Sequence, residues 1–306
     1  MTALVGWVAS NTLTDLRGRH FRLLPPSTRM RIANNARWMN EHVPALRNEM
    51  YRAGRRYDAV VFFKAMDPRC QEEAARIREY GGRVVFDANV NYYEIWGEYD
   101  IEETKPTGTQ QRDAIAMTTL ADAVVADSAY LLSIVQKHNA RAVAIPDNVD
   151  THRYRPRAPH ANRPVRRLVW SGMSKKARPL LSIADALSRL ERVELVVVSD
   201  RRPAVLDELS EAVPCRFVRF TERRYPRILR GCDVIVSPKR LSNAYELGHT
   251  EYKITLGMAA GLPAVASPQQ SYIDAIGHLG GGVIAERSDD WADALTRLLD
   301  EPGLRD

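Results

Sequence analysis

The sequence predicts an α/β protein with two Rossmann-like domains, whose parallel sheets face each other across a cleft. Apolar runs of strand length alternate with helical patterns along most of the chain, which is typical of parallel sheets covered by helices. The alternation is interrupted once, at residues 151–167, by a stretch with three prolines and little apolar content, as expected for a linker. The 306 residues also exceed the ~250–300 at which one core stops growing. We therefore expect an N-terminal domain at residues 1–157 and a C-terminal domain at residues 165–306.

The first half alternates as follows. Apolar runs predict strands at residues 4–8, 58–63, 83–86, 123–126 and 142–145. Helical patterns fall at residues 30–51, 71–80 and 112–120, and from Asp127 or Ser128, which caps the helix, to 137. Pro44 should bend or break the first helix. Residues 91–109 are irregular, aromatic and acidic.

The second half repeats the alternation. Strands are expected at residues 168–171, 194–199, 216–219, 234–237, 264–266 and 282–285. Helices are expected at residues 179–190, 204–212, 225–230, 253–260, 272–276 and 289–299. Gly261 can take the left-handed conformation that ends a helix, and Pro263 prevents continuation. The segment TEYKITLGMAAGLPAVAS (250–267) thus reads as a helix running into a buried strand, with its N-terminal N–H groups free for an anion such as phosphate.

Composition favours an intracellular globular protein. The net charge is +6 and the pI about 9.3; residues 1–50 hold seven arginines, including Arg17, Arg19, Arg22, Arg29, Arg31 and Arg37, against three acidic residues. A basic patch suits anionic lipid, nucleic acid or an acidic acceptor, or is merely a solvated surface. No nucleic-acid motif accompanies it, so we expect no nucleic-acid partner.

The cysteines and the N-terminus support a cytoplasmic location. Cys70, Cys215 and Cys232 lack metal-ligand spacing and read as buried apolar residues in a reducing compartment. The first ten residues read as a strand rather than a signal peptide, and no apolar stretch reaches the ~20 residues that span a bilayer. The seven histidines form no metal motif, so no metal site is expected.

The first candidate site is the loop WSGMSKKAR (170–178), between a strand and a helix. Gly172 lets backbone N–H groups approach a ligand. Ser174, Lys176 and Arg178 would hold a diphosphate beside it. Alternatively, the basic residues are only solvated.

The second candidate site is the polar loop at residues 238–249 together with the helix that follows it. A cation in the first helical turn opposes the helix dipole unless an anion is present; alternatively, Lys253 reaches solvent or pairs with Glu246 or Glu251. Thr250 is the expected helix cap. The candidate donor-binding residues here are Lys239, His249, Thr250, Glu251, Tyr252 and Lys253.

The third candidate site lies in the first domain. Lys64 and Asp87 follow successive strands, so both are expected at the cleft, where they either act in catalysis or simply pair. Asn89 and Asn148 are candidates for the acceptor side, although Asp147 and Asn148 also suit a plain turn.

Several of these segments resemble retaining glycosyltransferases of the GT-B fold, of the family 4 (group 1) type. In the first half they are VFFKA (61–65), GGRVVFDANVNYYE (81–94), LADAVVADSAYLLSIV (120–135) and AVAIPDNVDTHRYRP (142–156). In the second half they are LVWSGMSKKARPLL (168–181), LRGCDVIVSPKR (229–240) and YKITLGMAAGLPAVAS (252–267).

The resemblance implies transfer of a sugar from a nucleotide-sugar donor with retained anomeric configuration, without metal or cofactor. It places the diphosphate between the Gly172 loop, with Lys176 or Arg178, and the helix that carries Lys253. The acceptor, which is a glycan, lipid-linked or a small molecule, would bind the first domain. There the Arg-rich region 17–37 would hold an anionic acceptor or contact the inner face of a membrane.

The chain departs from the family at two points. The family has two glutamates eight positions apart, the second of which holds the ribose; here these positions are Gly248 and Leu256. The family also continues with a helix beyond the point that Asp306 occupies, so we expect a truncated sequence or less tightly latched domains. These departures motivate the alternative of a non-catalytic GT-B-like subunit in a glycan-assembly complex.

Overall fold

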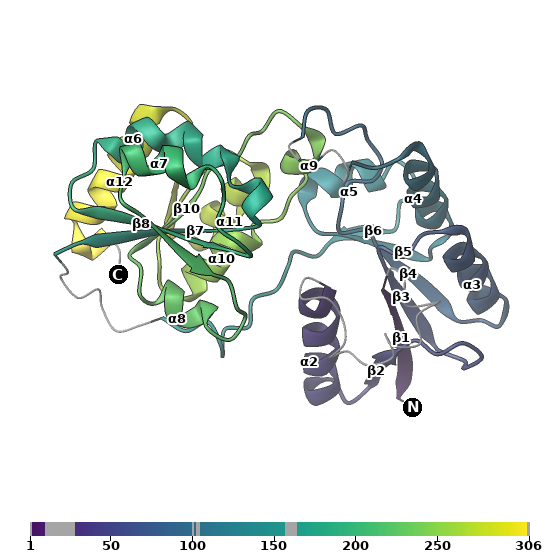
Figure 1. Cartoon of the computed structure of the whole chain (residues 1–306). Helices are drawn as coiled ribbons and strands as arrows, with labels where there is room; N and C mark the ends of the chain where they lie inside the picture. The colour runs from purple at the N-terminus through teal and green to yellow at the C-terminus, as the bar shows by residue number, and fades with distance from the viewer. Residues whose placement is uncertain (1, 10–27, 100, 102–104, 157–163, 305–306) are drawn as a thin grey trace. The chain divides into compact units, whose positions relative to one another are not determined.

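The computed structural model describes residues 2–9, 28–99, 101, 105–156 and 164–304 (Figure 1). Packing divides the chain into two compact units. The first unit comprises Met1–Gly97 and Glu103–Asn148, and the second unit comprises Glu98–Glu102 and Val149–Asp306. Each unit contains a six-stranded parallel sheet, as the alternating pattern predicts.

The sheet of the first unit has the order β2-β1-β3-β4-β5-β6. Its strands are β1 (Ala3–Ala9), β2 (Leu46–Met50), β3 (Ala59–Phe63), β4 (Arg83–Asp87), β5 (Ala123–Ala126) and β6 (Ala142–Ala144). One face packs against α3 (Pro68–Glu79), α4 (Gly108–Leu120) and α5 (Ala129–Val135), and the other against the π-helix η3 (Arg29–Ala33) and α2 (Asn34–His42).

One prediction in the first unit is wrong. The helix expected at residues 30–51 ends at His42, two residues before Pro44, and residues 46–50 form β2 instead. Pairing with β1 overrides the helical pattern there. The polar residue Asn48 is buried in this strand because it accepts a hydrogen bond from Trp7 Nε1 at 2.9 Å and donates its own N–H to Asn40 at 2.6 Å.

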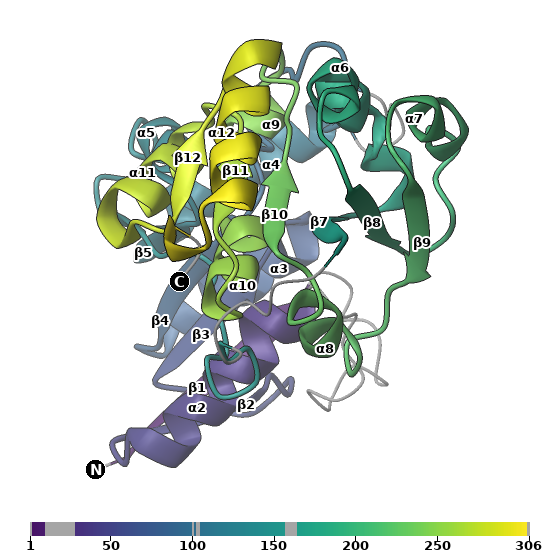
Figure 2. The same ribbon diagram turned by 90° about the vertical axis from the view of Figure 1, so that its left-hand side faces the viewer.

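The sheet of the second unit has the order β12-β11-β10-β7-β8-β9 (Figure 2). Its strands are β7 (Arg166–Ser171), β8 (Val193–Ser199), β9 (Cys215–Arg219), β10 (Val234–Ser237), β11 (Ala264–Ala266) and β12 (Gly282–Ile284). Numbered within the unit, this is the Rossmann order 3-2-1-4-5-6, in which ligands bind beyond the carboxyl ends of the strands.

Helices cover both faces of this second sheet. On one face lie α6 (Ala184–Ser188), α7 (Leu206–Ala212) and α12 (Ser288–Asp300); on the other lie α8 (Tyr225–Leu229), α10 (Tyr252–Ala259) and α11 (Gln270–Leu279). The helix expected at residues 179–190 is in fact a 3₁₀ segment, η6 (Arg178–Ile183), followed by α6. Three short elements were not predicted: the 3₁₀ turns η5 (Ser174–Lys176) and η7 (Pro302–Leu304) and the helix α9 (Ala244–Leu247).

The helix-to-strand segment at residues 250–267 has the predicted form. α10 ends next to Gly261, whose φ of +80° is the left-handed conformation, and β11 follows directly. Gly257 faces β10 so closely that an added Cβ would lie 2.6 Å from Ile235. The helix backbone therefore rests directly on the sheet.

None of the helices in the described part of the chain is both long and apolar enough to cross a bilayer. Cys70 and Cys232 are buried and Cys215 is half-buried, and all three are free thiols.

Candidate functional site

The Gly172 loop leaves β7 at a position where only glycine fits. A Cβ at Gly172 would lie 2.8 Å from the ring of Trp170, which is fully buried, and 3.5 Å from Nζ of Lys253. The loop backbone therefore runs directly beside a lysine ammonium. This bears on the predicted phosphate role, because a close backbone and a cation are both needed to hold a diphosphate.

Lys253 lies in the first turn of α10, as predicted. Its Nζ is 4.9 Å from the centre of the Trp170 ring, and no carboxylate in the described part of the chain forms an ion pair with it. The expected alternative of pairing with Glu246 or Glu251 is therefore not seen. Burial, together with the nearby charges of Lys239 and Lys176, lowers the pKa of Lys253 to about 7, against the opposing effect of Glu246.

Lys239 and Glu246 form a buried ion pair, with side chains 8% and 10% exposed. Glu246 is held in α9 because its N–H donates to the capping Asn243 Oδ1 at 2.8 Å. Although burial acts in the other direction, Lys239 and then Lys176 and Lys253 lower the pKa of Glu246. The charges of three lysines thus act on this one carboxylate.

Lys176 is held by aromatic side chains. Its Nζ lies 2.5 Å from the hydroxyl oxygen of Tyr245, 4.4 Å from the centre of that ring and 5.7 Å from the centre of the Tyr99 ring. The two rings are themselves 4.8 Å apart. These contacts, which include cation–π interactions, hold the ammonium group in place.

His249 is fixed as a neutral imidazole. Its Nδ1 accepts the N–H of Thr250 at 3.0 Å, so the hydrogen-bond network assigns the proton to Nε2. Its carbonyl oxygen accepts from Ser271 Oγ at 2.8 Å and from the buried Gln269 side chain. Burial and the three neighbouring lysines lower the pKa of His249 well below its ordinary value.

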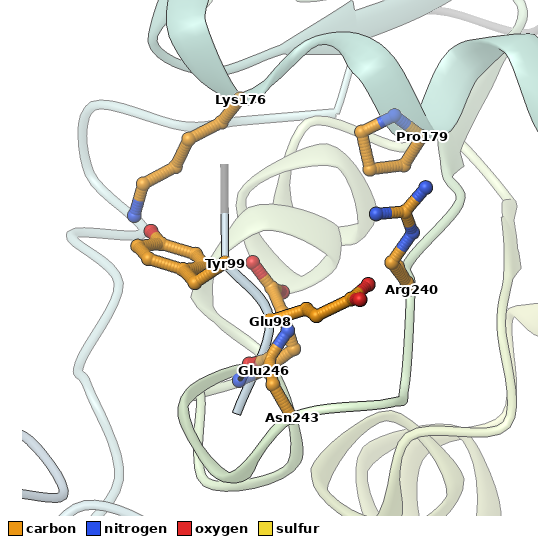
Figure 3. Close-up of a pocket in the computed structure, with 7 residues that line it drawn as sticks. All are labelled: Glu98, Tyr99, Lys176, Pro179, Arg240, Asn243 and Glu246. Atoms are coloured by element: carbon orange, nitrogen blue, oxygen red, sulfur yellow. Dashed lines mark hydrogen bonds between the residues drawn. The ribbon is translucent and has the colours of Figure 1, made fainter. Parts of the chain in front are cut away.

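A pocket opens beside this cluster within the second unit (Figure 3). Three separate segments build it: Glu98 and Tyr99 come from one, Lys176 and Pro179 from the Gly172 loop and η6, and Arg240, Asn243 and Glu246 from the loop after β10. Tyr99 was not predicted as a site residue. The only sequence signal for it was the aromatic, acidic character of residues 91–109.

Several predicted donor residues have other roles. Glu251, not Thr250, is the N-cap of α10, and Thr250 Oγ1 accepts a 3.4 Å bond from Tyr252 N–H. The cap differs because the helix begins at Tyr252, one residue later than a Thr250 cap requires. In the Gly172 loop, Ser174 N–H donates to Asp200 Oδ1 at 2.7 Å, so Ser174 fixes the loop to the end of β8.

Arg178 and Leu256 are two further positions that the sequence analysis singled out. Arg178 is exposed at the start of η6, and the positive charge around His249 comes from Lys239, Lys176 and Lys253 instead. Leu256 is 6% exposed and belongs to the apolar core between α10 and the sheet. It has no polar group to offer a nucleoside.

The carboxyl edge of the first sheet carries a second cluster, centred on Arg31. This side chain is buried; its Nε lies 3.0 Å from Asp87 Oδ2 and its Nη1 lies 3.1 Å from Asp147 Oδ1. The suggestion that Lys64 pairs with Asp87 is therefore wrong: only the backbone N–H of Lys64 bonds Asp87, at its carbonyl, and Arg31 takes the carboxylate. Sequence reasoning missed the ion pair between Arg31 and Asp87 because the two residues are 56 positions apart in the chain.

The same contacts correct the expected role of the Arg-rich region 17–37. Arg31 cannot reach an anionic acceptor or a membrane, because it is buried between two carboxylates. Arg37 is exposed on α2. Arg17, Arg19 and Arg22, and the side chain of Arg29, lie outside what the structure describes.

Lys64 and Asn89 follow β3 and β4 with left-handed backbones, at φ +50° and +49°. Asn89 Nδ2 donates to Asp127 Oδ2 at 3.0 Å, and Asn148 Nδ2 donates to Asn35 Oδ1 at 3.0 Å. Asp127 was considered only as a possible helix cap, but Ser128 caps α5. The structure thus gathers Lys64, Asp87 and Asn89 as predicted and adds Asp127 to them.

Burial dominates the electrostatics of this second cluster. It raises the pKa of Asp127 well above the ordinary value, with Asp147 adding to the effect and Arg31 opposing it. It lowers the pKa of Lys64, against Asp87, Asp147 and Asp127. Across the described residues of both units, no group of three His, Cys, Asp or Glu side chains is arranged to hold a metal ion.

Comparison with known proteins agrees with this geometry. Residues 165–301, which lie in the second unit, match the family described as "Glycosyl transferases group 1". No curated protein matches the sequence. The second unit is therefore similar in sequence to that family.

Solved structures share the fold of both units. Anabaena Alr3699/HepE in complex with UDP matches with a TM-score of 0.65 at 12% identity, over 100% of this chain and 92% of that one. WaaG, a glycosyltransferase involved in lipopolysaccharide biosynthesis, matches with a TM-score of 0.58 at 13% identity, over 99% and 92%.

TarM matches with a TM-score of 0.61 at 13% identity, over 81% of this chain and 49% of that one, so this chain spans about half the length of TarM. These likenesses, with two six-stranded parallel sheets, confirm the predicted pair of Rossmann-like domains of the GT-B type.

Proposed function

We propose that this protein is a glycosyltransferase that moves a sugar from a nucleotide-sugar donor to an acceptor, with retained anomeric configuration and without a metal ion. The observation that carries the proposal is the lysine cluster of the second unit. Lys176, Lys239 and Lys253 gather around one carboxylate where the Gly172 loop meets the start of α10.

The cluster suits a departing nucleoside diphosphate. Lys253 is held beside the Gly172 backbone at a position where its charge is disfavoured, so an arriving diphosphate removes an existing penalty. The N-terminal N–H groups of α10 add partial positive charge. Fixed positive groups of this kind stabilise the charge that develops on a leaving group, which is the task a metal ion performs in other transferases.

Similar structures support the donor class. Anabaena Alr3699/HepE has been solved in complex with UDP and with UDP-glucose, and an S. aureus TarM mutant has been solved with UDP, α-GlcNAc-glycerol and fondaparinux. We infer a nucleotide-sugar donor for this chain, and as acceptor a glycan, a lipid-linked sugar or a small molecule. The three free thiols fit a reducing, cytoplasmic setting.

A thermal-shift panel of UDP, GDP, dTDP and their sugars tests the donor site. We expect at least one nucleotide to raise the melting temperature, and Lys176→Ala combined with Lys253→Ala to abolish the shift. Each lost charge-assisted contact is worth about 1.5–3 kcal/mol, so the double variant should lose ~10²–10⁴-fold in affinity. Lys175→Ala, an exposed lysine of the same loop, is the control. If no nucleotide shifts the melting temperature, the proposal fails.

A non-catalytic subunit is the second candidate, and Leu256 favours it. A buried leucine stands where the family has the glutamate that holds the ribose, so donor affinity rests on the phosphate contacts. Incubating the purified chain with the nucleotide sugar that gives the largest thermal shift separates the two. Donor hydrolysis or sugar transfer rules out the non-catalytic reading.

A further inference from the structure

We propose that Asp127, Lys64 and Asn89 of the first unit form a subsite for a neutral sugar hydroxyl, which makes the acceptor an uncharged polyhydroxylated compound rather than an anionic one. The inference rests on the proposed function and narrows its acceptor class. Its basis is one buried oxygen atom without a partner and the charge balance around that atom.

Asp127 supplies the oxygen. The side chain lies at the end of β5 and the residue is 4% exposed. Its Oδ2 accepts the Asn89 amide at 3.0 Å, whereas no donor in the described part of the chain reaches its buried Oδ1. Buried polar atoms are almost always paired. The charges that act most strongly on this carboxyl are those of Asp147, Arg31 and Asp87, so it lies within the cluster at the carboxyl edge of the sheet.

Lys64 supplies a donor within the same cluster. It follows β3, is half-buried, and forms no ion pair in the described part of the chain; its Nζ lies 4.7 Å from the centre of the Phe63 ring. Asp127 is among the carboxylates whose charge acts on it. A hydroxyl can do both things that these side chains need, since it donates to a carboxyl oxygen and accepts from an ammonium.

The backbone at Lys64 and Asn89 is also constrained. Lys64 and Asn89 end neighbouring strands, and both are held left-handed, a conformation that residues other than glycine seldom adopt. The two turns are tied together because Lys64 N–H donates to the Asp87 carbonyl oxygen at 3.0 Å. Strain of this kind concentrates at functional sites, where the surrounding structure holds it in place.

Charge then selects the class of ligand. Among the described residues, the cluster contains three carboxyl groups, those of Asp87, Asp127 and Asp147, against two cations. One of the cations, Arg31, is buried and already shared by Asp87 and Asp147. Of these two described cations, Lys64 is the one that a phosphate or carboxylate ligand would find, and the ligand would lie beside the three carboxyl groups. A neutral hydroxyl avoids that repulsion and satisfies the unpaired oxygen.

The test is a transfer assay with matched acceptors, using the donor identified by thermal shift. Methyl glucoside and methyl galactoside are the neutral acceptors; methyl glucuronide and glucose 6-phosphate are the anionic ones. We expect neutral acceptors to be favoured at least tenfold in kcat/KM. Asp127→Asn should raise the acceptor KM at least tenfold, while the nucleotide thermal shift, which reports on the second unit, stays unchanged. Glu72→Gln, an exposed carboxylate of α3, should change nothing.

Two results would overturn the inference. One is a preference for the anionic acceptors; the other is an unchanged acceptor KM in a folded Asp127→Asn protein, which would make Asp127 purely structural. If that variant does not fold, Lys64→Met decides by the same KM criterion. If the proposed function itself is wrong, the result is distinguishable from these two. In that case the unmodified protein binds no nucleotide and hydrolyses no donor.

Discussion

The two units place charged side chains at the same edge of the same kind of sheet, with opposite balance. In the second unit, the charges of Lys176, Lys239 and Lys253 act on the carboxylate of Glu246. In the first unit, Arg31 and Lys64 lie among three carboxylates. The carboxyl edge of a parallel sheet is where such folds bind ligands, and charge decides which ligand each edge accepts.

The difference also lies in how each unit uses its buried ion pair. Lys239 and Glu246 neutralise each other, and Lys253, which forms no ion pair in the described part of the chain, remains available to an anion. Arg31 forms ion pairs with both Asp87 and Asp147. The buried polar atom without a hydrogen-bond partner in the described part of this unit is Oδ1 of Asp127. One edge is thus prepared for negative charge and the other for a hydrogen-bond donor.

Removing the buried cations should produce the largest effects. Arg31→Met removes the ion-pair partner of the buried Asp87 and of the half-buried Asp147, and Lys239→Met removes that of the buried Glu246. Each should lower the free energy of unfolding by about 3–5 kcal/mol, Arg31→Met more than Lys239→Met. Urea denaturation measures both. The control is Arg83→Met, whose ion pair with Asp122 is 72% exposed on the arginine side and worth ~0–1 kcal/mol. An Arg31→Met loss no larger than the control would mean that Arg31 does not hold the cluster.

Gly172→Ala should damage the donor edge specifically. The new Cβ meets the buried Trp170 ring at 2.8 Å, which costs about 1–3 kcal/mol in stability and displaces the loop from Lys253. The nucleotide thermal shift should disappear. Gly277→Ala is the matched control: no atom lies within 4 Å of its added Cβ in α11, so it should be neutral or stabilise by ~0.5–1 kcal/mol. A full nucleotide shift in the Gly172→Ala protein would show that the loop does not hold the phosphate.

The sequence was sufficient for the architecture and for much of the donor edge. Alternating apolar runs located eleven of the strands, and Gly261 and Pro263 located the end of α10. Local pattern worked there because buried parallel strands are continuously apolar. It failed at β2, whose sequence LRNEM is polar and is made a strand by its pairing with β1.

The acceptor edge was less accessible to sequence reasoning for a related reason. Lys64, Asp87 and Asn89 could be found because each follows a strand. Arg31 could not, because it comes from a π-helix and meets Asp87 and Asp147 across 56 and 116 residues. Tyr99 escaped for the same reason. Long-range partners of charged side chains carry no local periodicity.

The depressed pKa of Lys253 makes donor binding depend on pH. Its pKa is lowered to about 7 by burial, Lys239 and Lys176, against Glu246; His249 beside it is neutral. A bound diphosphate raises this pKa, so binding above pH 7 should take up as much as one proton, and affinity should fall by up to tenfold per pH unit, about 1.4 kcal/mol. Calorimetry in buffers of different ionisation enthalpy measures the uptake. Lys253→Met should remove it and Lys175→Met should not.

The same shift has a consequence for stability. Because the folded-state pKa lies below the unfolded value, the unfolded chain binds more protons between pH 7 and the ordinary lysine range. The free energy of unfolding of the ligand-free protein should therefore rise with pH across that window, and the rise should be smaller in Lys253→Met. If the free energy of unfolding depends on pH equally in the unmodified protein and in Lys253→Met, the group with the lowered pKa is not Lys253.

The smallest expected effects come from replacing two left-handed residues, Arg192 and Asn89, with glycine. The comparison asks whether the backbone strain at Asn89 is linked to the cluster around Asp127. Arg192 is left-handed at φ +54° on an exposed turn of the second unit. Arg192→Gly relieves about 1–2 kcal/mol of backbone strain against ~0.5–1 kcal/mol of added chain entropy, so thermal denaturation should show a gain of at most about 1.5 kcal/mol. Asn89→Gly relieves the same conformation but removes the bond to Asp127, worth about 0.5–1.5 kcal/mol. It should therefore gain nothing or lose stability. If both variants are stabilised equally, the Asn89 turn holds no carboxyl in place, and the contrast between the two edges rests on charge alone.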